Sequence, residues 1–169
     1  MINTYNLSSF ISESFLDYPD NFSLCVVFYM PGCDRNCLDC QNKELQDFQV
    51  YDGIEKFSEI ILGFCKRAKT NKLCLQGGDP LFKHNLFLTK HLLDELSSQL
   101  DICIYTGAEK NEIEGSGLKG FKFIKGGRFI KDLYIGSEKT DKYMQFASKN
   151  QFLLDSNFNV ISKDGIYYF

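Results

Sequence analysis

The chain has 169 residues, enough for one well-cored domain and short for two. Its 44% hydrophobic and 24% charged content is typical of a globular protein. The net charge of −3 gives no reason to expect nucleic acid or membrane as a partner. No apolar run approaches the roughly 20 residues of a membrane span, and the first residues do not resemble a signal peptide. We therefore expect one cytoplasmic domain over residues 1–169, with its core at about 22–155.

The first half of the chain alternates apolar strands with amphipathic helices. Residues 24–29 form a continuous apolar run, the pattern of a strand buried on both faces. Residues 54–69 place apolar side chains at every third or fourth position and predict a helix. Asp52 with Glu55 is interpreted as a capping box at the start of this helix.

The same alternation continues through the middle of the chain. Residues 72–76 predict a second strand, followed by a Gly-Gly-Asp-Pro turn and a leucine-rich helix at 86–100. Residues 101–105 predict a third strand, after which Thr106 with Glu109 is expected to cap a short helix.

The last third of the chain gives weaker signals. Residues 121–125 predict a fourth strand, which Gly126 and Gly127 close. Residues 140–149 are interpreted as a helix, and residues 152–169 as short β segments separated by turns.

Strands that alternate with helices over short connections should be parallel, with right-handed crossovers. The chain is too short to close a full barrel, so we expect an α/β fold, a partial βα barrel with a mostly parallel curved sheet. In such folds the loops at the carboxyl ends of the strands gather at one site. The turn after the second strand and the residues after the first and third strands should therefore face one mouth.

Seven cysteines, an odd number, and no secretory signal argue against a disulfide framework. Four of them lie in apolar stretches and are expected to be inert core residues: Cys25, Cys65, Cys74 and Cys103. The other three form the pattern C-x3-C-x2-C in a polar loop after the first strand: Cys33, Cys37 and Cys40.

Three interpretations of this trio remain open. A structural zinc site needs four Cys or His ligands, and the only histidines, His84 and His91, are seven residues apart and far from the trio in sequence. A redox pair of Cys37 and Cys40 leaves Cys33 unexplained. A [4Fe–4S] cluster uses all three thiols and keeps one iron free to bind a substrate.

The Gly77-Gly78-Asp79-Pro80 turn has an ordinary interpretation as the end of a strand. Beside an open cluster it gains a second one. Glycines allow close backbone approach to a ligand, and the Asp79 carboxylate can accept hydrogen bonds from an ammonium group. A ligand with both an amine and a carboxylate would suit both features.

The cysteine motif, followed by Gln41 and Asn42 and later by the Gly-Gly-Asp-Pro turn, resembles that of the radical S-adenosylmethionine (SAM) enzymes. More closely, the chain is similar to the small activating proteins of anaerobic ribonucleotide reductase. The similar segments are residues 14–20, 28–33, 75–81, 105–107, 127–133 and 148–151.

This resemblance implies a mechanism and its cofactors. Cys33, Cys37 and Cys40 would hold a [4Fe–4S] cluster, and SAM would chelate the fourth iron. Reductive cleavage of SAM would give methionine and a 5′-deoxyadenosyl radical, which would take a hydrogen atom from a glycine of the reductase. The cofactors would carry the difficult chemistry, and the protein would ligate and orient them.

The resemblance also implies site residues and partners. Gly77, Gly78, Asp79 and Pro80 would form the turn that meets the SAM amine. Thr106 would contact SAM elsewhere, and Lys125 and Arg128 are further candidates. The partners would be the large subunit of anaerobic ribonucleotide reductase, a glycyl radical protein, and an electron donor such as flavodoxin.

Two residues depart from the family pattern. Asp39 stands where an aromatic residue often precedes the third cysteine, and Asp20 stands where a glycine is common. Two other functions remain open: a small radical SAM enzyme acting on a small molecule, similar to 7-carboxy-7-deazaguanine synthase, and a non-catalytic zinc-binding interaction module.

Overall fold

A curved six-stranded sheet forms the centre of the molecule in a computed structural model that describes residues 1–169. The four inner strands are parallel, and each edge strand is antiparallel to its neighbour. In spatial order the strands are β1 (Ile11–Ser14), β2 (Cys25–Met30), β3 (Lys72–Gly77), β4 (Asp101–Tyr105), β5 (Phe123–Gly126) and β8 (Phe152–Asp155). The expected mostly parallel α/β sheet of a partial βα barrel is confirmed.

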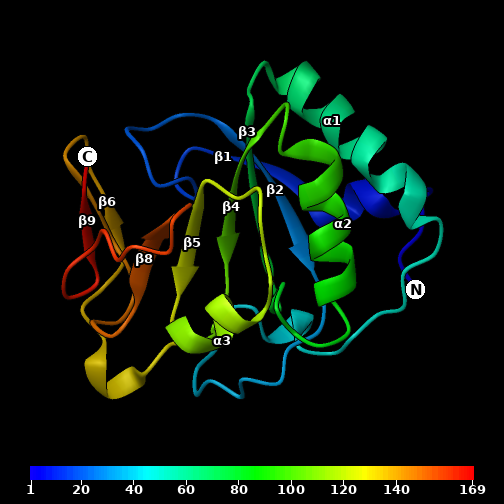
Figure 1. Cartoon of the computed structure of the whole chain (residues 1–169). Helices are drawn as coiled ribbons and strands as arrows, with labels where there is room; N and C mark the ends of the chain where they lie inside the picture. The colour runs from blue at the N-terminus through cyan, green and yellow to red at the C-terminus, as the bar shows by residue number, and fades with distance from the viewer.

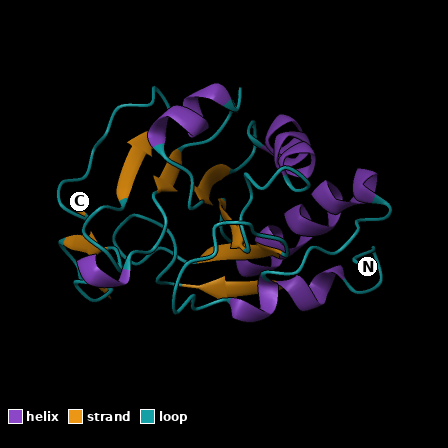
Figure 2. Cartoon of the chain, turned by 90° about the horizontal axis from the view of Figure 1, so that it is seen from below, coloured by secondary structure: helices purple, strands orange, loops and turns teal.

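The α-helices lie on the outer side of the curved sheet (Figures 1 and 2). They are α1 (Phe57–Ala68), α2 (Leu86–Leu96) and α3 (Lys110–Gly115). Four short 3-10 helices are η1 (Leu7–Phe10), η2 (Lys43–Leu45), η3 (Ile54–Lys56) and η4 (Lys131–Leu133). None of these helices has the length and apolar character that a transmembrane span requires.

Side chains alternate between the two faces of the sheet, as the pleat of a β-strand requires. On β2, Val26 and Phe28 belong to the core cluster that packs against α1 and α2. Cys25 and Val27 belong to a smaller cluster on the inner face. Both sets are fully buried, which confirms the prediction of a first strand buried on both faces.

The four cysteines predicted to be core residues are all buried. Cys25, Cys74 and Cys103 lie on neighbouring strands within the inner cluster, and Cys65 packs from α1 into the outer core. Burial raises the pKa of the Cys65 thiol to about 11 and that of Cys25 to about 12. Both thiols are therefore neutral at physiological pH, as inert core residues should be.

A second, three-stranded antiparallel sheet covers part of the inner face. Its strands are β6 (Glu138–Lys139), β7 (Tyr143–Gln145) and β9 (Ile166–Tyr168), in that order. Met144 and Phe146 form a buried cluster with Leu153 of β8. This small sheet supplies the wall that an open βα sheet lacks.

The loop between β1 and β2 lies at the end of the inner face where β2 begins, opposite the carboxyl ends of the parallel strands. Its Tyr18 is buried against Phe123. Lys139 of β6 donates hydrogen bonds to the backbone oxygens of Phe15 at 2.9 Å and Tyr18 at 2.6 Å. Lys72 forms an ion pair with Asp20 of the same loop. The N-terminal loop and the small sheet are thus tied together across the barrel opening.

One sequence prediction about the last third fails, and one edge strand of the sheet was not predicted. The predicted helix at 140–149 is wrong, because Met144 and Phe146 are buried while Tyr143 and Gln145 are not, which is the period of a strand. Strand β1 was not expected, because its four residues are mostly polar and exposed, as an edge strand can be.

The predicted helix caps also differ from the structure. Asp52 and Glu55 do not form a capping box; Gly53 precedes a 3-10 turn that leads into α1. Before α3 the capping box joins Glu109 and Glu112. Thr106 instead accepts a hydrogen bond from the Ala108 N–H.

The packing of α2 on the sheet gives a direct test of the core. Leu92 is fully buried, whereas Phe87 on the same helix is 70% exposed. Leu92→Ala should lower the free energy of unfolding by about 2–5 kcal/mol, because it leaves a cavity. Phe87→Ala should change it by less than about 0.5 kcal/mol. Urea unfolding followed by circular dichroism measures both, and equal effects would contradict the packing described.

Candidate functional site

The carboxyl ends of the parallel strands border one pocket of about 470 Å³. Three structural elements predicted to share a mouth contribute to it: the cysteine loop after β2, the turn after β3 and the segment after β4. Their lining residues are Cys33, Cys37, Cys40, Gly77, Gly78 and Thr106. The small sheet completes the wall with Glu138, Lys139, Met144, Gln145 and Phe146. Asp79 and Pro80 are buried behind this lining.

The cysteine loop has no regular secondary structure over most of its length, and two left-handed residues curl it. Asn36 has φ +49° and Asp39 has φ +58°. Asn and Asp tolerate this conformation better than most residues do. The curl leaves all three thiols half-buried at the pocket instead of sealing them in the core.

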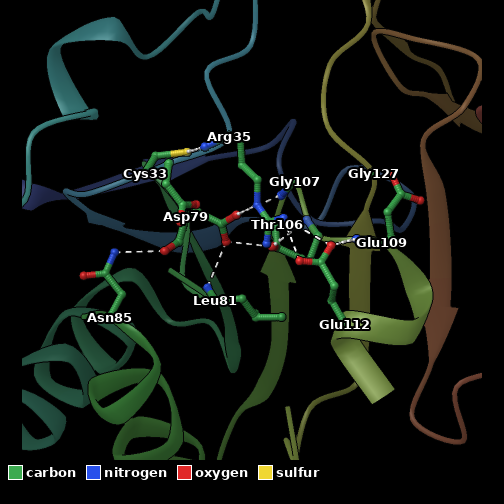
Figure 3. A network of polar contacts seen from close by, with 12 residues as sticks. Cys33, Arg35, Asp79, Leu81, Asn85, Thr106, Gly107, Glu109, Glu112 and Gly127 are labelled. Atoms are coloured by element: carbon green, nitrogen blue, oxygen red, sulfur yellow. Dashed lines mark hydrogen bonds and ion pairs between the residues drawn. The ribbon is translucent and has the colours of Figure 1, made fainter. Parts of the chain in front are cut away.

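The buried carboxylate of Asp79 joins the structural elements around the pocket (Figure 3). Its Oδ1 accepts hydrogen bonds from the Thr106 hydroxyl at 2.6 Å and the Leu81 N–H at 2.8 Å. Its Oδ2 accepts from Arg35 Nε at 3.0 Å and the Gly107 N–H at 3.2 Å. These donors occupy the roughly four acceptor sites of a carboxylate. The predicted contact between Asp79 and an ammonium group stays a prediction, and here the carboxylate holds the protein together.

Arg35 connects the cysteine loop to α3 and was not singled out from the sequence. It lies between Cys33 and Cys37, and its Nη1 donates to both carboxylate oxygens of Glu112, at 2.8 and 3.1 Å. Burial by itself would lower the pKa of Arg35, but the bonds to Glu112 and Asp79 outweigh burial and raise it. The sequence signal for Arg35 was a single positively charged residue within the cysteine loop. Its partners Asp79 and Glu112 could not be predicted from the sequence, because they lie 44 and 77 residues away.

The two glycines of the turn bring its backbone against the cysteine loop. Gly77 has φ +120°, and a Cβ there would lie 2.6 Å from the Met30 nitrogen. A Cβ on Gly78 would lie 2.6 Å from the Leu45 oxygen. The Asp79 N–H donates to the Gly32 oxygen at 2.8 Å. The glycines were predicted to let a ligand come close to the backbone of the turn. In the structure, the protein's own cysteine loop occupies part of that space.

Other polar groups hold the same junction. Asn42, two residues beyond the cysteine motif, donates from Nδ2 to the Gly77 oxygen at 3.2 Å. Thr89 of α2 donates to the Pro80 oxygen at 2.8 Å. The buried Asn85 donates to the backbone oxygens of Gly32 and Asp79. The turn and the cysteine loop thus form one hydrogen-bonded unit.

The two residues that depart from the family pattern have structural roles here. Asp39 is exposed and pairs with Lys131 of η4 at 2.5 Å, which links the cysteine loop to the C-terminal part of the chain. Asp20 accepts a hydrogen bond from the Ser23 N–H at 3.1 Å in addition to its ion pair with Lys72. Neither side chain lines the pocket.

The donor set fits an iron–sulfur cluster. Three thiols from one loop border a single pocket, and Lys125, which has no ion-pair partner in the chain, lines the same pocket as a positive charge. No three Cys, His, Asp or Glu side chains converge on a point where a single ion would sit. Ligands of a four-iron cluster bind separate irons, so their sulfurs do not need to meet at one point.

The role of the Asp79 network is testable by removal of its charge. Asp79→Asn puts an amide group where donors from Arg35 and Gly107 converge, and leaves the arginine without its buried partner. The free energy of unfolding should fall by about 3–5 kcal/mol, the usual cost of breaking a buried pair. Asp94→Asn, on the exposed face of α2, should be nearly neutral. Denaturant unfolding measures the free energy of unfolding of both variants. An Asp79→Asn variant as stable as the wild type would contradict the structural role of Asp79.

The lack of space at Gly78 gives a second test. Gly78→Ala should destabilise the chain by about 3 kcal/mol, at the upper end for overpacking, because backbone atoms meet the new methyl group. Gly115→Ala is the matched control, since a Cβ there meets nothing within 4 Å. The melting temperature of each variant, followed by circular dichroism, measures the difference. If Gly78→Ala and Gly115→Ala were equally stable, the backbone around Gly78 would have space for a methyl group, and the close packing described would be wrong.

Comparison with known families agrees with this site. The model of the 4Fe-4S single cluster domain matches residues 23–154, which spans the parallel strands and the cysteine loop. Neither the comparison with curated proteins nor the comparison with solved structures gave a match. A half-buried trio of thiols at the strand ends is the feature that such a domain requires, and the chain belongs to the 4Fe-4S single cluster domain family, of the radical SAM type.

Proposed function

We propose that the chain is a radical SAM activating enzyme that generates a glycyl radical on anaerobic ribonucleotide reductase. The observation that carries the proposal is the shared pocket: the C-x3-C-x2-C thiols and the Gly77-Gly78 backbone line the same cavity. Its volume of about 470 Å³ lies within the usual range of roughly 300–1,000 Å³ for small-molecule sites. The choice of reductase as target is supported by the resemblance of short segments of the chain to those of its activating proteins.

In this proposal Cys33, Cys37 and Cys40 hold the [4Fe–4S] cluster, and SAM occupies the rest of the pocket. A cluster and SAM held there would supply the one-electron chemistry needed to form a glycyl radical on the partner. An electron donor such as flavodoxin completes the system. The residues of the chain ligate the cluster, position SAM and shield the site from water. They do not themselves change oxidation state.

The residues around the pocket perform these supporting tasks. Arg35 and Asp79 fix the cysteine loop against the strand ends, so the thiols stay at the pocket. The backbone carbonyl groups of the turn are proposed to accept hydrogen bonds from the SAM amine. Phe146 and Met144 form an apolar part of the wall and limit the access of water.

The amide side chains of the pocket favour this function over one with a second small-molecule substrate. Gln151 accepts a hydrogen bond from the Ser148 N–H and donates to the Gly127 oxygen. Gln145 donates to the Ile135 and Gly136 oxygens. The side-chain nitrogens of both residues and the Gln151 side-chain oxygen are thus occupied within the protein. A target presented by a partner protein needs fewer such groups inside the pocket.

The test of this function begins with cluster assembly. Anaerobic reconstitution with iron and sulfide should give roughly four irons per chain in the wild type. Cys37→Ala should lose most of this iron together with the visible absorption of the cluster. Cys65→Ala, which removes a buried thiol outside the pocket, should retain both. Equal iron content in the two variants would contradict the ligand assignment.

The reaction is tested on the reconstituted protein. After reduction and addition of SAM, chromatography should detect 5′-deoxyadenosine, and electron paramagnetic resonance should detect a glycyl radical once the reductase is added. Cleavage of SAM without a radical on the reductase would assign the chain to another radical SAM reaction. A loaded cluster without any cleavage of SAM would exclude the whole class.

A further inference from the structure

Glu112 of α3 contacts the end of the Arg35 side chain beside the cysteine loop (Figure 3). Arg35 Nη1 donates to both carboxylate oxygens of Glu112, at 2.8 and 3.1 Å. The Glu109 N–H donates to Oε2 of the same carboxylate at 2.7 Å. The bonds from Glu109 and from Arg35 lower the pKa of Glu112, so the carboxylate is charged at neutral pH. It is held in place by the helix that carries it and by the loop that it contacts.

The network around Arg35 contains one carboxylate more than its single cation requires. The buried Asp79 already supplies a counter-charge, 3.0 Å from Arg35 Nε. Glu112 adds a second, so two negative charges face one positive charge. The Glu112 side chain is 45% exposed, and an ion pair this exposed contributes little to stability. Its charge is therefore the property that matters for the site.

This network lies directly against the cysteine ligands. Arg35 stands between Cys33 and Cys37 in the chain, and its backbone N–H donates to the Cys33 sulfur at 3.4 Å. Arg35 also lines the pocket together with the three thiols. The net charge around a [4Fe–4S] cluster helps to set its reduction potential, because reduction adds a negative charge. A guanidinium group at this place would raise the potential if its charge were not cancelled.

The other charged groups nearby do not replace Glu112. Three of them line the polar cleft beside α3, but they are exposed and form no ion pair: Asp34, Glu109 and Arg128. Lys125 lines the pocket and adds a positive charge of its own. Without Glu112, two cations, Arg35 and Lys125, would stand against one buried carboxylate, Asp79.

We propose that Glu112 is a positioning residue that acts on the cluster through Arg35: its charge cancels the positive charge of Arg35 and so keeps the reduction potential of the cluster low. Arg35 is required at the loop because the buried Asp79 carboxylate needs a partner. Glu112 lets the chain keep this clamp without making the cluster a weaker reductant. The inference rests on the cluster ligands of the function proposed above and does not depend on SAM or on a partner protein.

The reduction potential of the cluster tests this role. Glu112→Gln keeps an acceptor for Arg35 and removes only the charge. In an anaerobic redox titration of the reconstituted chain, followed by visible absorption, the equilibrium constant of one-electron reduction should rise about threefold to tenfold. This corresponds to a midpoint potential higher by roughly 30–60 mV. Glu112→Asp keeps the charge, and its potential should stay closer to that of the wild type than to that of Glu112→Gln.

Matched variants keep the result interpretable. Glu114→Gln makes the same change on the same helix, but Glu114 pairs with Lys110 and lines neither the pocket nor the cleft. Its potential should equal that of the wild type. Glu112→Met is a second neutral variant for the case that Glu112→Gln does not fold. Circular dichroism and iron content check that each variant is folded and loaded, and an unchanged iron content with a shifted potential shows an effect of charge.

The outcomes separate this inference from the function proposed above. If the neutral variants of Glu112 load the cluster and keep the wild-type potential, the role of Glu112 is wrong. An equal shift in Glu114→Gln would also overturn it, because it would reflect the overall charge of the chain. Loss of the cluster from both neutral variants would show that Glu112 only holds the loop. The proposed function fails separately, if the loaded wild type does not cleave SAM.

Discussion

The buried carboxylate of Asp79 is the interaction on which the geometry of the site depends. Taking a carboxylate out of water costs several kcal/mol unless its acceptor sites are filled. Here Arg35, the Thr106 hydroxyl and two backbone N–H groups fill them, and these donors come from the cysteine loop, the end of β4 and the turn itself. Because an unpaired buried carboxylate would be strongly unfavourable, the folded chain has to bring the cysteine loop, the end of β4 and the turn after β3 together around Asp79.

This constraint explains why an irregular loop can hold three thiols in place. The loop between Gly32 and η2 has no ladder of its own, so its position comes from contacts to the turn after β3. Gly78 permits the close approach and Arg35 adds a charged clamp. An incomplete barrel would leave such a site open on one side. The small C-terminal sheet and the loop around Tyr18 close it, joined by Lys139.

Much of the fold could be predicted from local patterns. Strands β2 to β5 and helices α1 and α2 have strong periodicity or apolar runs, because each buries one or both faces in a single large core. Strand β1 and the strands of the small sheet are short and half-exposed, so their apolar pattern is too weak to distinguish strand from helix. The capping predictions failed for a related reason: several polar residues in a row can each act as a cap, and packing selects among them.

The sequence by itself determined the ligands and their setting: three cysteines in one loop, a glycine turn later in the chain, and strand ends that parallel topology brings to one edge. Spacing along the chain carries that information. Only the tertiary structure decided what the charged groups do there. It assigned Asp79 to Arg35 and Thr106, and left Lys125 in the pocket without a partner. Contacts between residues far apart in sequence, and the desolvation that comes with them, exist only once the chain has folded.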